Sequence, residues 1–345
     1  MATHLKHGRL KLALALVIVA AAVFAAMWWQ RTLGFAERGL AIEPQAQAQA
    51  MVLVIERGDG FNAVLRKLRA LGVRQGSDLE WKLLARKLGV AGKLQVGEYA
   101  ITPGITPEAL LRRLGAGEVI QRKFTVIEGW SFRDLRAALA AESRLAQNTR
   151  GLDDAAVMAK LGRSGVPAEG RFLPETYVYT RGTDDLAILD RAAKAMDVAL
   201  AEAWEGRQPD LPLASPDELL TLASIVEKET GQAGERARIA GVFVRRLRLG
   251  MRLETDPTVI YGMGAAYDGN IRKKDLQTDT PYNTYQRAGL PPTPIAMPGK
   301  AALQATAHPA PGDELFFVAR GNGEHQFSAT YAEHAAAVRR YQLRR

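Results

Sequence analysis

Two glutamates in one predicted helix are the side chains of this sequence best suited to acid–base chemistry. They lie in the segment 222–230, LASIVEKET. At helical spacing, Glu229 follows Ile225 and Val226 by four and three residues and so continues an apolar stripe, whereas Glu227 falls on a smaller, more polar side. Desolvation at the end of an apolar stripe raises the pKa of a carboxyl. A raised pKa favours the protonated form that a general acid needs near neutral pH.

The element that must position these glutamates is a long predicted helix. Ser215 followed by proline is typical of an N-cap with proline at the first helical position, and a helical run from Asp217 to Arg246 follows it. The same stretch also fits a charged surface turn, in which the glutamates pair with Arg236 and Arg238. Spacing alone leaves both interpretations open.

Polar and aromatic side chains follow this helical run. Asp256, which precedes a proline, is typical of another helix N-cap. Tyr282, Asn283 and Tyr285 offer two ring faces and an amide, which suits sugar rings and their hydroxyls, although two core tyrosines beside a turn asparagine would look the same. The segment 289–299 holds four prolines in eleven residues, which predicts a stiff loop.

In their order and length, these motifs closely resemble those of the endolytic murein transglycosylases, the YceG-like proteins. The similar segments are ASIVEKET at 223–230, VFVRRLRLGMRLETDPTVIYGMG at 242–264, TPYNTY at 280–285 and GLPPTPIAMPG at 289–299. The sequence departs from the usual family pattern at Glu254, where members often carry an uncharged polar residue, and at Glu175, where aspartate is usual.

The resemblance implies a lytic transglycosylase. Such an enzyme would cleave the β-1,4 bond between N-acetylmuramic acid and N-acetylglucosamine within peptidoglycan strands, leave 1,6-anhydromuramic acid ends and limit strand length. The resemblance places the catalytic glutamate at Glu229, the residue that the helical spacing also favours, with Glu227 as a secondary candidate. The substrate-binding candidates are Asp256, Tyr282, Asn283 and Tyr285. No cofactor is expected.

The segment 12–29, LALALVIVAAAVFAAMWW, predicts a transmembrane helix. At about 1.5 Å per residue it would span roughly 27 Å, close to the thickness of a bilayer core of about 30 Å. Basic residues precede it within 1–11 and two tryptophans end it, which favours a cytoplasmic N-terminus. A cleaved signal peptide is the alternative, but its apolar region usually runs about 7–15 residues. We therefore expect a single-pass protein of a bacterial inner membrane, with its catalytic part in the periplasm.

The rest of the chain divides into a spacer and two folded parts. Residues 30–50 end in a Gln/Ala-rich spacer. Residues 51–121 begin with a short strand, a Gly-Asp turn and a helix, which resembles a LysM-type glycan-binding module; a βα unit that only orients the next domain is the alternative. Residues 122–345 are the predicted helix-rich catalytic domain, with short strands around 124–128 and 315–319. The expected fold class is α+β.

Composition limits the chemistry and the partners. The 345 residues include no cysteine, which excludes disulfide scaffolds and thiol catalysis. The formal charge of +9 suggests an anionic partner. Outside the cytoplasm we expect this partner to be peptidoglycan and not nucleic acid. His308, His325 and His334 could ligate zinc, but no metal site is predicted because they lack a zinc-binding spacing such as H-E-x-x-H.

A non-catalytic function is the alternative. A membrane-tethered, peptidoglycan-binding scaffold of the cell-wall synthesis complex would need the same anchor, spacer and LysM-like module. The apolar position of Glu229 and the stiff polar loops favour the enzyme. Peptidoglycan synthases are partners that only the family resemblance implies.

Overall fold

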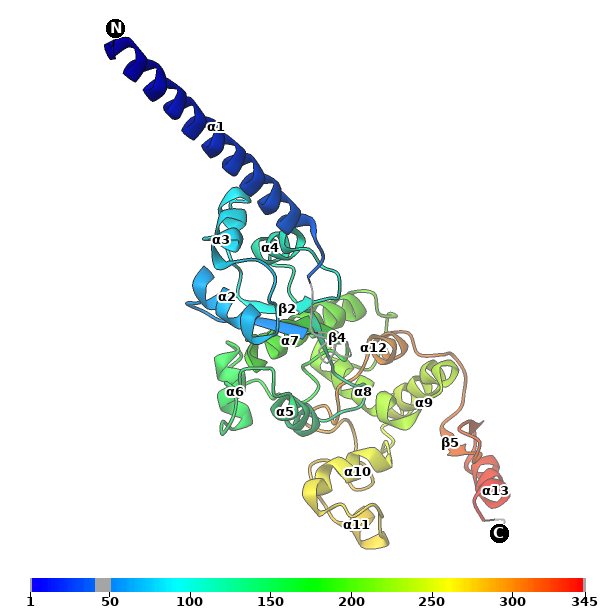
Figure 1. The fold of residues 1–345 in the computed structure, drawn as a ribbon. Coiled ribbons are helices and arrows are strands. Elements are labelled where there is room, and N and C mark those ends of the chain that lie inside the picture. The colour runs from blue at the N-terminus through cyan, green and yellow to red at the C-terminus, as the bar shows by residue number, and fades with distance from the viewer. Residues whose placement is uncertain (1, 41–50, 344–345) are drawn as a thin grey trace. The chain divides into compact units, whose positions relative to one another are not determined.

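A computed structural model of the chain describes residues 2–40 and 51–343 (Figure 1). The chain divides into two compact units, Met1–Arg122 and Lys123–Arg345. The predicted start of the catalytic domain at residue 122 lies beside this division. Residues 41–50 of the predicted spacer 30–50 lie outside the described part of the chain.

The first unit consists of helices and one small sheet. In chain order its elements are α1 (Ala2–Glu37), β1 (Met51–Ile55), α2 (Phe61–Ala70), α3 (Asp78–Lys87), β2 (Gly97–Ile101) and α4 (Pro107–Ala116). β1 and β2 pair antiparallel, with Met51 opposite Ile101 and Ile55 opposite Gly97. Apolar side chains from all six elements form one core, in which Trp81 and Tyr99 are fully buried.

Local sequence explains where these helices begin. The hydroxyl of Ser77 accepts from the backbone of Glu80, and the Glu80 carboxylate accepts from the backbone of Ser77, a reciprocal capping box. Thr106 caps α4 with its hydroxyl alone, which accepts from the Ala109 amide, and Pro107 is at the first helical position, as the sequence predicts.

α1 is continuous across the predicted transmembrane segment 12–29. Among the residues whose placement the structure describes, no helix is long and apolar enough to cross a membrane. Membrane anchoring therefore stays a prediction from the sequence.

The second unit is mostly helical, with short strands. Its elements are β3 (Arg122–Thr125), α5 (Phe132–Ala141), α6 (Asp154–Lys160), β4 (Thr176–Tyr179), α7 (Asp185–Glu205), α8 (Pro216–Glu229), η2 (Ala233–Glu235), α9 (Arg236–Arg248), α10 (Asp256–Met263), η3 (Gly264–Ala266), α11 (Lys273–Gln277), α12 (Lys300–Ala307), β5 (Phe316–Ala319), β6 (His325–Ser328) and α13 (Tyr331–Tyr341). β3 pairs with β4, and β5 pairs antiparallel with β6. The mixed α+β architecture that the sequence predicts is confirmed.

α8 is the central helix of this unit. It packs against α7, α9 and α12, which surround it in Figure 1. The apolar stripe of Leu222, Ile225 and Val226 is completely buried, and so are Ala223 and Ser224 on the side expected to be more polar. The Ser224 hydroxyl is satisfied there, since it donates to the carbonyl of Thr221 and accepts from the amide of Ile295.

The predicted helical run Asp217–Arg246 is wrong as one helix. α8 ends at Glu229, Thr230 is extended, and α9 begins at Arg236. The reason is local: a β-branched threonine is followed by glycines at 231 and 234, all poor helix formers. Glu229 is therefore the last residue of its helix.

The predicted start of the next helix is also off by one residue. Thr255, with extended backbone angles, is the N-cap of α10, so Asp256 is the first helical residue and not the cap. In the part of the chain that the structure describes, the Thr255 side chain makes no capping hydrogen bond to α10, and the Asp256 carboxylate accepts from the hydroxyl of Tyr285.

Candidate active site

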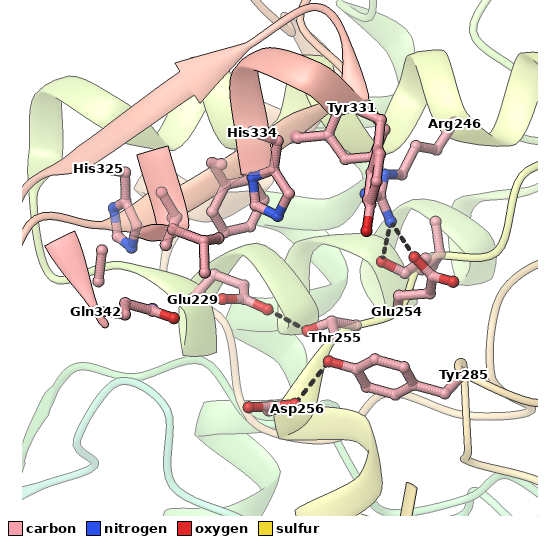
Figure 2. Close-up of a pocket in the computed structure, with 16 residues that line it drawn as sticks. Glu229, Arg246, Glu254, Thr255, Asp256, Tyr285, His325, Tyr331, His334 and Gln342 are labelled. Carbon is pink, nitrogen blue, oxygen red and sulfur yellow. Dashed lines mark hydrogen bonds and ion pairs between the residues drawn. The ribbon is translucent and has the colours of Figure 1, made fainter. Parts of the chain in front are cut away.

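A pocket of about 440 Å³ lies at the C-terminal end of α8. One wall comes from α9 and from residues 253–256, which lead into α10, and Tyr285 adds to it. The opposite wall comes from β5, β6 and α13, as the close-up shows (Figure 2). Segments far apart in sequence thus meet around Glu229.

Glu229 is half-buried, and its carboxyl accepts a hydrogen bond from the hydroxyl of Thr255 (Figure 2). Burial raises the pKa of this carboxyl to about 7. The negative charge of Asp256 raises the pKa further, while the Thr255 hydrogen bond and the nearby His325 and Arg246 side chains oppose the rise. Glu229 can therefore hold or release a proton near neutral pH.

The position of Glu229 in its helix also raises the pKa of its carboxyl. As the last residue of α8 it lies at the end where the helix dipole is negative and the backbone carbonyls lack helical partners. A carboxylate is less stable than a neutral carboxyl at this end. The broken helix thus supports the protonated form that the apolar stripe predicts.

A network of threonines fixes the hydroxyl that contacts Glu229. The Thr255 amide donates to the hydroxyl of Thr284 at 3.1 Å, and the Thr258 hydroxyl donates to the Thr255 carbonyl at 2.8 Å. The hydroxyls of Thr258 and Thr284 lie 2.9 Å apart. All three threonines are buried. Thr255 therefore has little freedom to turn away from the carboxyl.

The structure brings two of the predicted substrate-binding residues into this pocket. The Tyr285 hydroxyl donates to the Asp256 carboxylate at 2.7 Å, below Glu229 in Figure 2. Burial and the neighbouring Asp256 raise the pKa of Tyr285, so it stays a neutral donor. Asp256 and Tyr285 together present an oriented polar pair close to the carboxyl.

The two departures from the family pattern lie in different surroundings. Glu254 lines the pocket in the left-handed region, at φ 51°, and its carboxylate lies 3.4 Å from the guanidinium of Arg246. Glu254 thus offsets the charge of an arginine that faces the pocket. Glu175 is outside the pocket lining and pairs with Lys300 at 3.3 Å on the surface.

Asn283 is 1% exposed and is occupied by its own loop. Its amide nitrogen lies 2.7 to 3.1 Å from three backbone carbonyls, and its side-chain oxygen accepts from the Tyr285 amide at 2.9 Å. It does not line the pocket. Its amide therefore organises the loop that carries Tyr285.

The remaining two sequence candidates lie away from this pocket. Tyr282 lines a different pocket, and its hydroxyl lies 2.8 Å from that of Thr293. The Glu227 side chain is 5% exposed, accepts from the Gly299 amide at 2.9 Å and lies 3.8 Å from Arg236. Burial raises the pKa of Glu227, but its carboxyl does not reach the space in front of Glu229.

Sequence reasoning missed several residues of the opposite wall. Tyr331 is 72% exposed at the pocket, and the ring of His334 stacks on Phe316 with centroids 5.2 Å apart. His325 pairs with Glu235 at 2.7 Å. The site residues predicted from the sequence do not include His325, His334 or Tyr331. Pairing across the β5–β6 hairpin and the packing of α13 on it bring this wall together.

Fold and pocket define a class: an α+β protein with one half-buried carboxyl, poised for general acid–base chemistry between polar and aromatic walls. Residues 53–340 match the YceG-like family, so the chain belongs to that family. The family predicted from the sequence motifs is therefore confirmed, and so, at the level of the family, is the enzyme class.

Relatives of known activity support this assignment. The chain is 31% identical over 304 residues to the endolytic murein transglycosylase of Bacillus subtilis, covering 83% of each protein. It is 28% identical over 259 residues to the endolytic murein transglycosylase of Streptococcus pneumoniae, but spans only 46% of that longer protein. The crystal structure of a yceG-like protein from Listeria monocytogenes matches with a TM-score of 0.55 at 27% identity, covering 84% of this chain and 99% of that one.

Proposed function

We propose that this protein is an endolytic peptidoglycan transglycosylase with Glu229 as its catalytic acid and base. The observation that carries the proposal is the half-buried Glu229 carboxyl, with a pKa of about 7, at the base of an open pocket. The motif match at 223–230 and the named activity of the relatives support the same residue and the same polymer.

One carboxyl is enough when the substrate supplies its own nucleophile. Neutral Glu229 donates its proton to the glycosidic oxygen as the bond from muramyl C1 breaks, so the N-acetylglucosamine end leaves as an alcohol. The resulting carboxylate takes the proton of the muramyl C6 hydroxyl, whose oxygen attacks C1. A 1,6-anhydro ring closes, Glu229 is protonated again, and no water is consumed. Ordinary glycosidases, in contrast, use a second carboxylate as base or nucleophile.

The neighbours of Glu229 have supporting roles. Thr255 holds the carboxyl in place, and the Asp256–Tyr285 pair provides oriented polar groups for sugar hydroxyls. Tyr331 offers an exposed ring face at the opposite wall, suited to a sugar ring. Cutting within strands needs such contacts on both sides of the broken bond.

We infer the cellular setting from the sequence. The apolar segment 12–29 with its basic flank supports an inner-membrane anchor with the catalytic unit in the periplasm. An anchored enzyme would meet nascent strands and limit their length. The 51–121 segment, which resembles a LysM module, would help to hold glycan.

Incubation with purified peptidoglycan tests the proposal. Mass spectrometry should detect 1,6-anhydromuramyl ends with the wild-type protein. Glu229→Gln, which keeps the size and the acceptor for Thr255, should lower the rate by about 10²–10⁴-fold. Glu227→Gln is the matched control on the same helix and should lose less than tenfold. Near wild-type activity of Glu229→Gln would refute the assignment, and a wild type that binds peptidoglycan without cutting it would favour a scaffold.

A further inference from the structure

A second pocket, of about 830 Å³, opens beside the first in the same unit. Lys228 and Pro257 line it, while the adjoining residues Glu229 and Asp256 line the first pocket. Neighbouring Cα atoms are only about 3.8 Å apart. The end of α8 and the start of α10 thus form the boundary between two adjacent spaces, and a ligand at Glu229 lies next to both.

Part of the lining of the second pocket is apolar and aromatic. Phe132, Ile260 and Ile295 contribute to it, and Tyr261 packs edge-on against Tyr282 with centroids 4.9 Å apart. The Tyr282 hydroxyl is already engaged by Thr293 at 2.8 Å. This surface suits small aliphatic groups, such as the methyl groups of alanine residues, and has few free hydrogen-bonding groups for sugar hydroxyls.

The carboxylates of the second pocket are engaged by the protein itself. Asp134 accepts from the Ser131 amide at 3.0 Å and caps α5, and Asp154 pairs with Arg136 at 2.7 Å. Both oxygens of the buried Glu169 accept from the Phe132 amide, at 3.0 and 3.2 Å. The Arg136 guanidinium offsets the charge of Asp154, and burial raises the pKa of Glu169 to about 7. Asp134 keeps its negative charge, which acts on Arg133 and Lys228.

The two cations of the second pocket, Arg133 and Lys228, are exposed and make few contacts with the protein. Arg133 is exposed and makes no hydrogen bond or ion pair with any residue that the structure describes. Lys228 is exposed, and its ammonium has a single partner among the described residues, the Gly129 carbonyl at 3.2 Å. Two cations thus stand against one carboxylate without a cationic partner, Asp134, and the pocket keeps a surplus of positive charge that favours an anionic ligand.

We propose that the second pocket binds the peptide stem of the muramyl residue at the cleavage site, with stem carboxylates on Arg133 and Lys228. The inference rests on the proposed function, since it assigns that substrate a further contact. The stem hangs from the same sugar whose C1 bond breaks, so it must leave the first pocket close to Glu229. Its carboxylates match the two cations, and its alanine methyl groups match the apolar surface. The volume lies within the range of about 300–1,000 Å³ that is common for ligand sites.

The full-length protein tests this inference with two substrates. One is intact glycan strands that carry stems; the other is the same strands after an amidase has removed the stems. The measured quantity is the ratio of kcat/KM on stem-bearing strands to kcat/KM on bare strands, from the yield of anhydro ends. Wild type should favour stem-bearing strands. R133Q/K228Q should lower the ratio roughly 2- to 30-fold, as expected for two exposed ion pairs. High salt should lower the wild-type ratio too.

The control is R150Q/K160Q, which removes the same charge from two exposed cations of this unit outside both pockets. It should keep the wild-type ratio. Binding measured in the Glu229→Gln background, without turnover, should show the same loss for stem-bearing strands only. A ratio that R133Q/K228Q leaves unchanged within twofold would overturn the stem site. In that case, anhydro ends released from both substrates would still support the transglycosylase activity. Failure of the stem site and failure of the proposed function therefore give different results.

Discussion

The hydroxyl of Thr255 donates a hydrogen bond to the carboxyl of Glu229 and so joins the N-cap of α10 to the last residue of α8. This hydrogen bond holds the Glu229 carboxyl in place and also lowers its pKa. Burial favours the neutral carboxyl, whereas this hydrogen bond favours the carboxylate, and the balance leaves the pKa at about 7. A general acid that must also act as a base within one reaction needs such a balance.

Thr255→Val should make Glu229 a weaker acid. Valine keeps the shape but removes the donor, and a hydrogen bond to a charged group contributes about 1.5–3 kcal/mol. The pKa of Glu229 should therefore rise by about 1–2 units, and the alkaline limb of the kcat/KM profile should move to higher pH by the same amount. A profile lowered equally at every pH would show that Thr255 has only a structural role. Thr255→Ser, which keeps the hydroxyl, should restore the wild-type limb.

The raised pKa of Glu229 should cost stability at alkaline pH. Burial raises this pKa from 4.5 to about 7 in the folded chain, so between these values the folded state binds more protons than the unfolded state. The free energy of unfolding must then fall as pH rises through this window, by up to about 3 kcal/mol. Glu229→Gln removes the effect. In urea denaturation, the free energy of unfolding of the variant relative to that of wild type should increase from pH 5 to pH 8. A difference that does not change with pH would contradict the raised pKa.

Glu169 does not disturb that comparison. Burial also raises the pKa of Glu169 to about 7, but this residue is present in both proteins, so its contribution cancels. Glu169→Gln should show the same gain in stability with rising pH. It should differ from Glu229→Gln in keeping activity within about tenfold, because Glu169 caps α5 and lies outside the first pocket.

Asn283→Ala should act through stability. The substitution removes the side-chain donor of the backbone carbonyls of residues 275 and 278, and it leaves the carbonyl of residue 276 with Gln286 alone, in a loop where Asn283 is buried. We expect a loss of about 2–4 kcal/mol in the free energy of unfolding, measured by chemical denaturation. Asn270→Ala, at an exposed asparagine, should stay within about 0.5 kcal/mol of wild type. Unchanged stability of Asn283→Ala with a raised KM would instead favour a sugar contact.

Tyr331→Ala should weaken substrate binding without slowing the chemistry. The ring is exposed at the pocket and offers a face but no proton-transfer group close to Glu229. Losing one aromatic contact of about 0.5–1.5 kcal/mol should raise KM roughly 2- to 13-fold with kcat nearly constant. Tyr331→Phe should behave like wild type, and Tyr341→Ala tests for general damage to α13. A fall in kcat alone would argue against a binding role.

Local sequence predicted the helices and their ends where side chains cap the backbone. Thr106 and Ser215 each precede a proline, and the helices α4 and α8 begin where these pairs predict. The prediction failed between Glu229 and Arg236, because apolar periodicity continues across a segment in which two glycines and a β-branched residue favour other conformations. Periodicity describes which face is apolar but does not say whether the backbone stays helical.

The sequence by itself determined the family and the position of Glu229 on an apolar stripe, because both depend on residues close together in the chain. Only the tertiary structure decided which side chains share its pocket. Thr255, Tyr285 and Tyr331 lie 26, 56 and 102 positions beyond Glu229 in the numbering and meet it through packing. Tertiary packing also gave Asn283 and Tyr285 different roles: Tyr285 lines the pocket, whereas Asn283 is buried and its amide donates to backbone carbonyls of its own loop. A buried amide must satisfy such partners before it can contact a ligand. Contacts between distant segments carry no local pattern, so the walls of the site had to come from the fold.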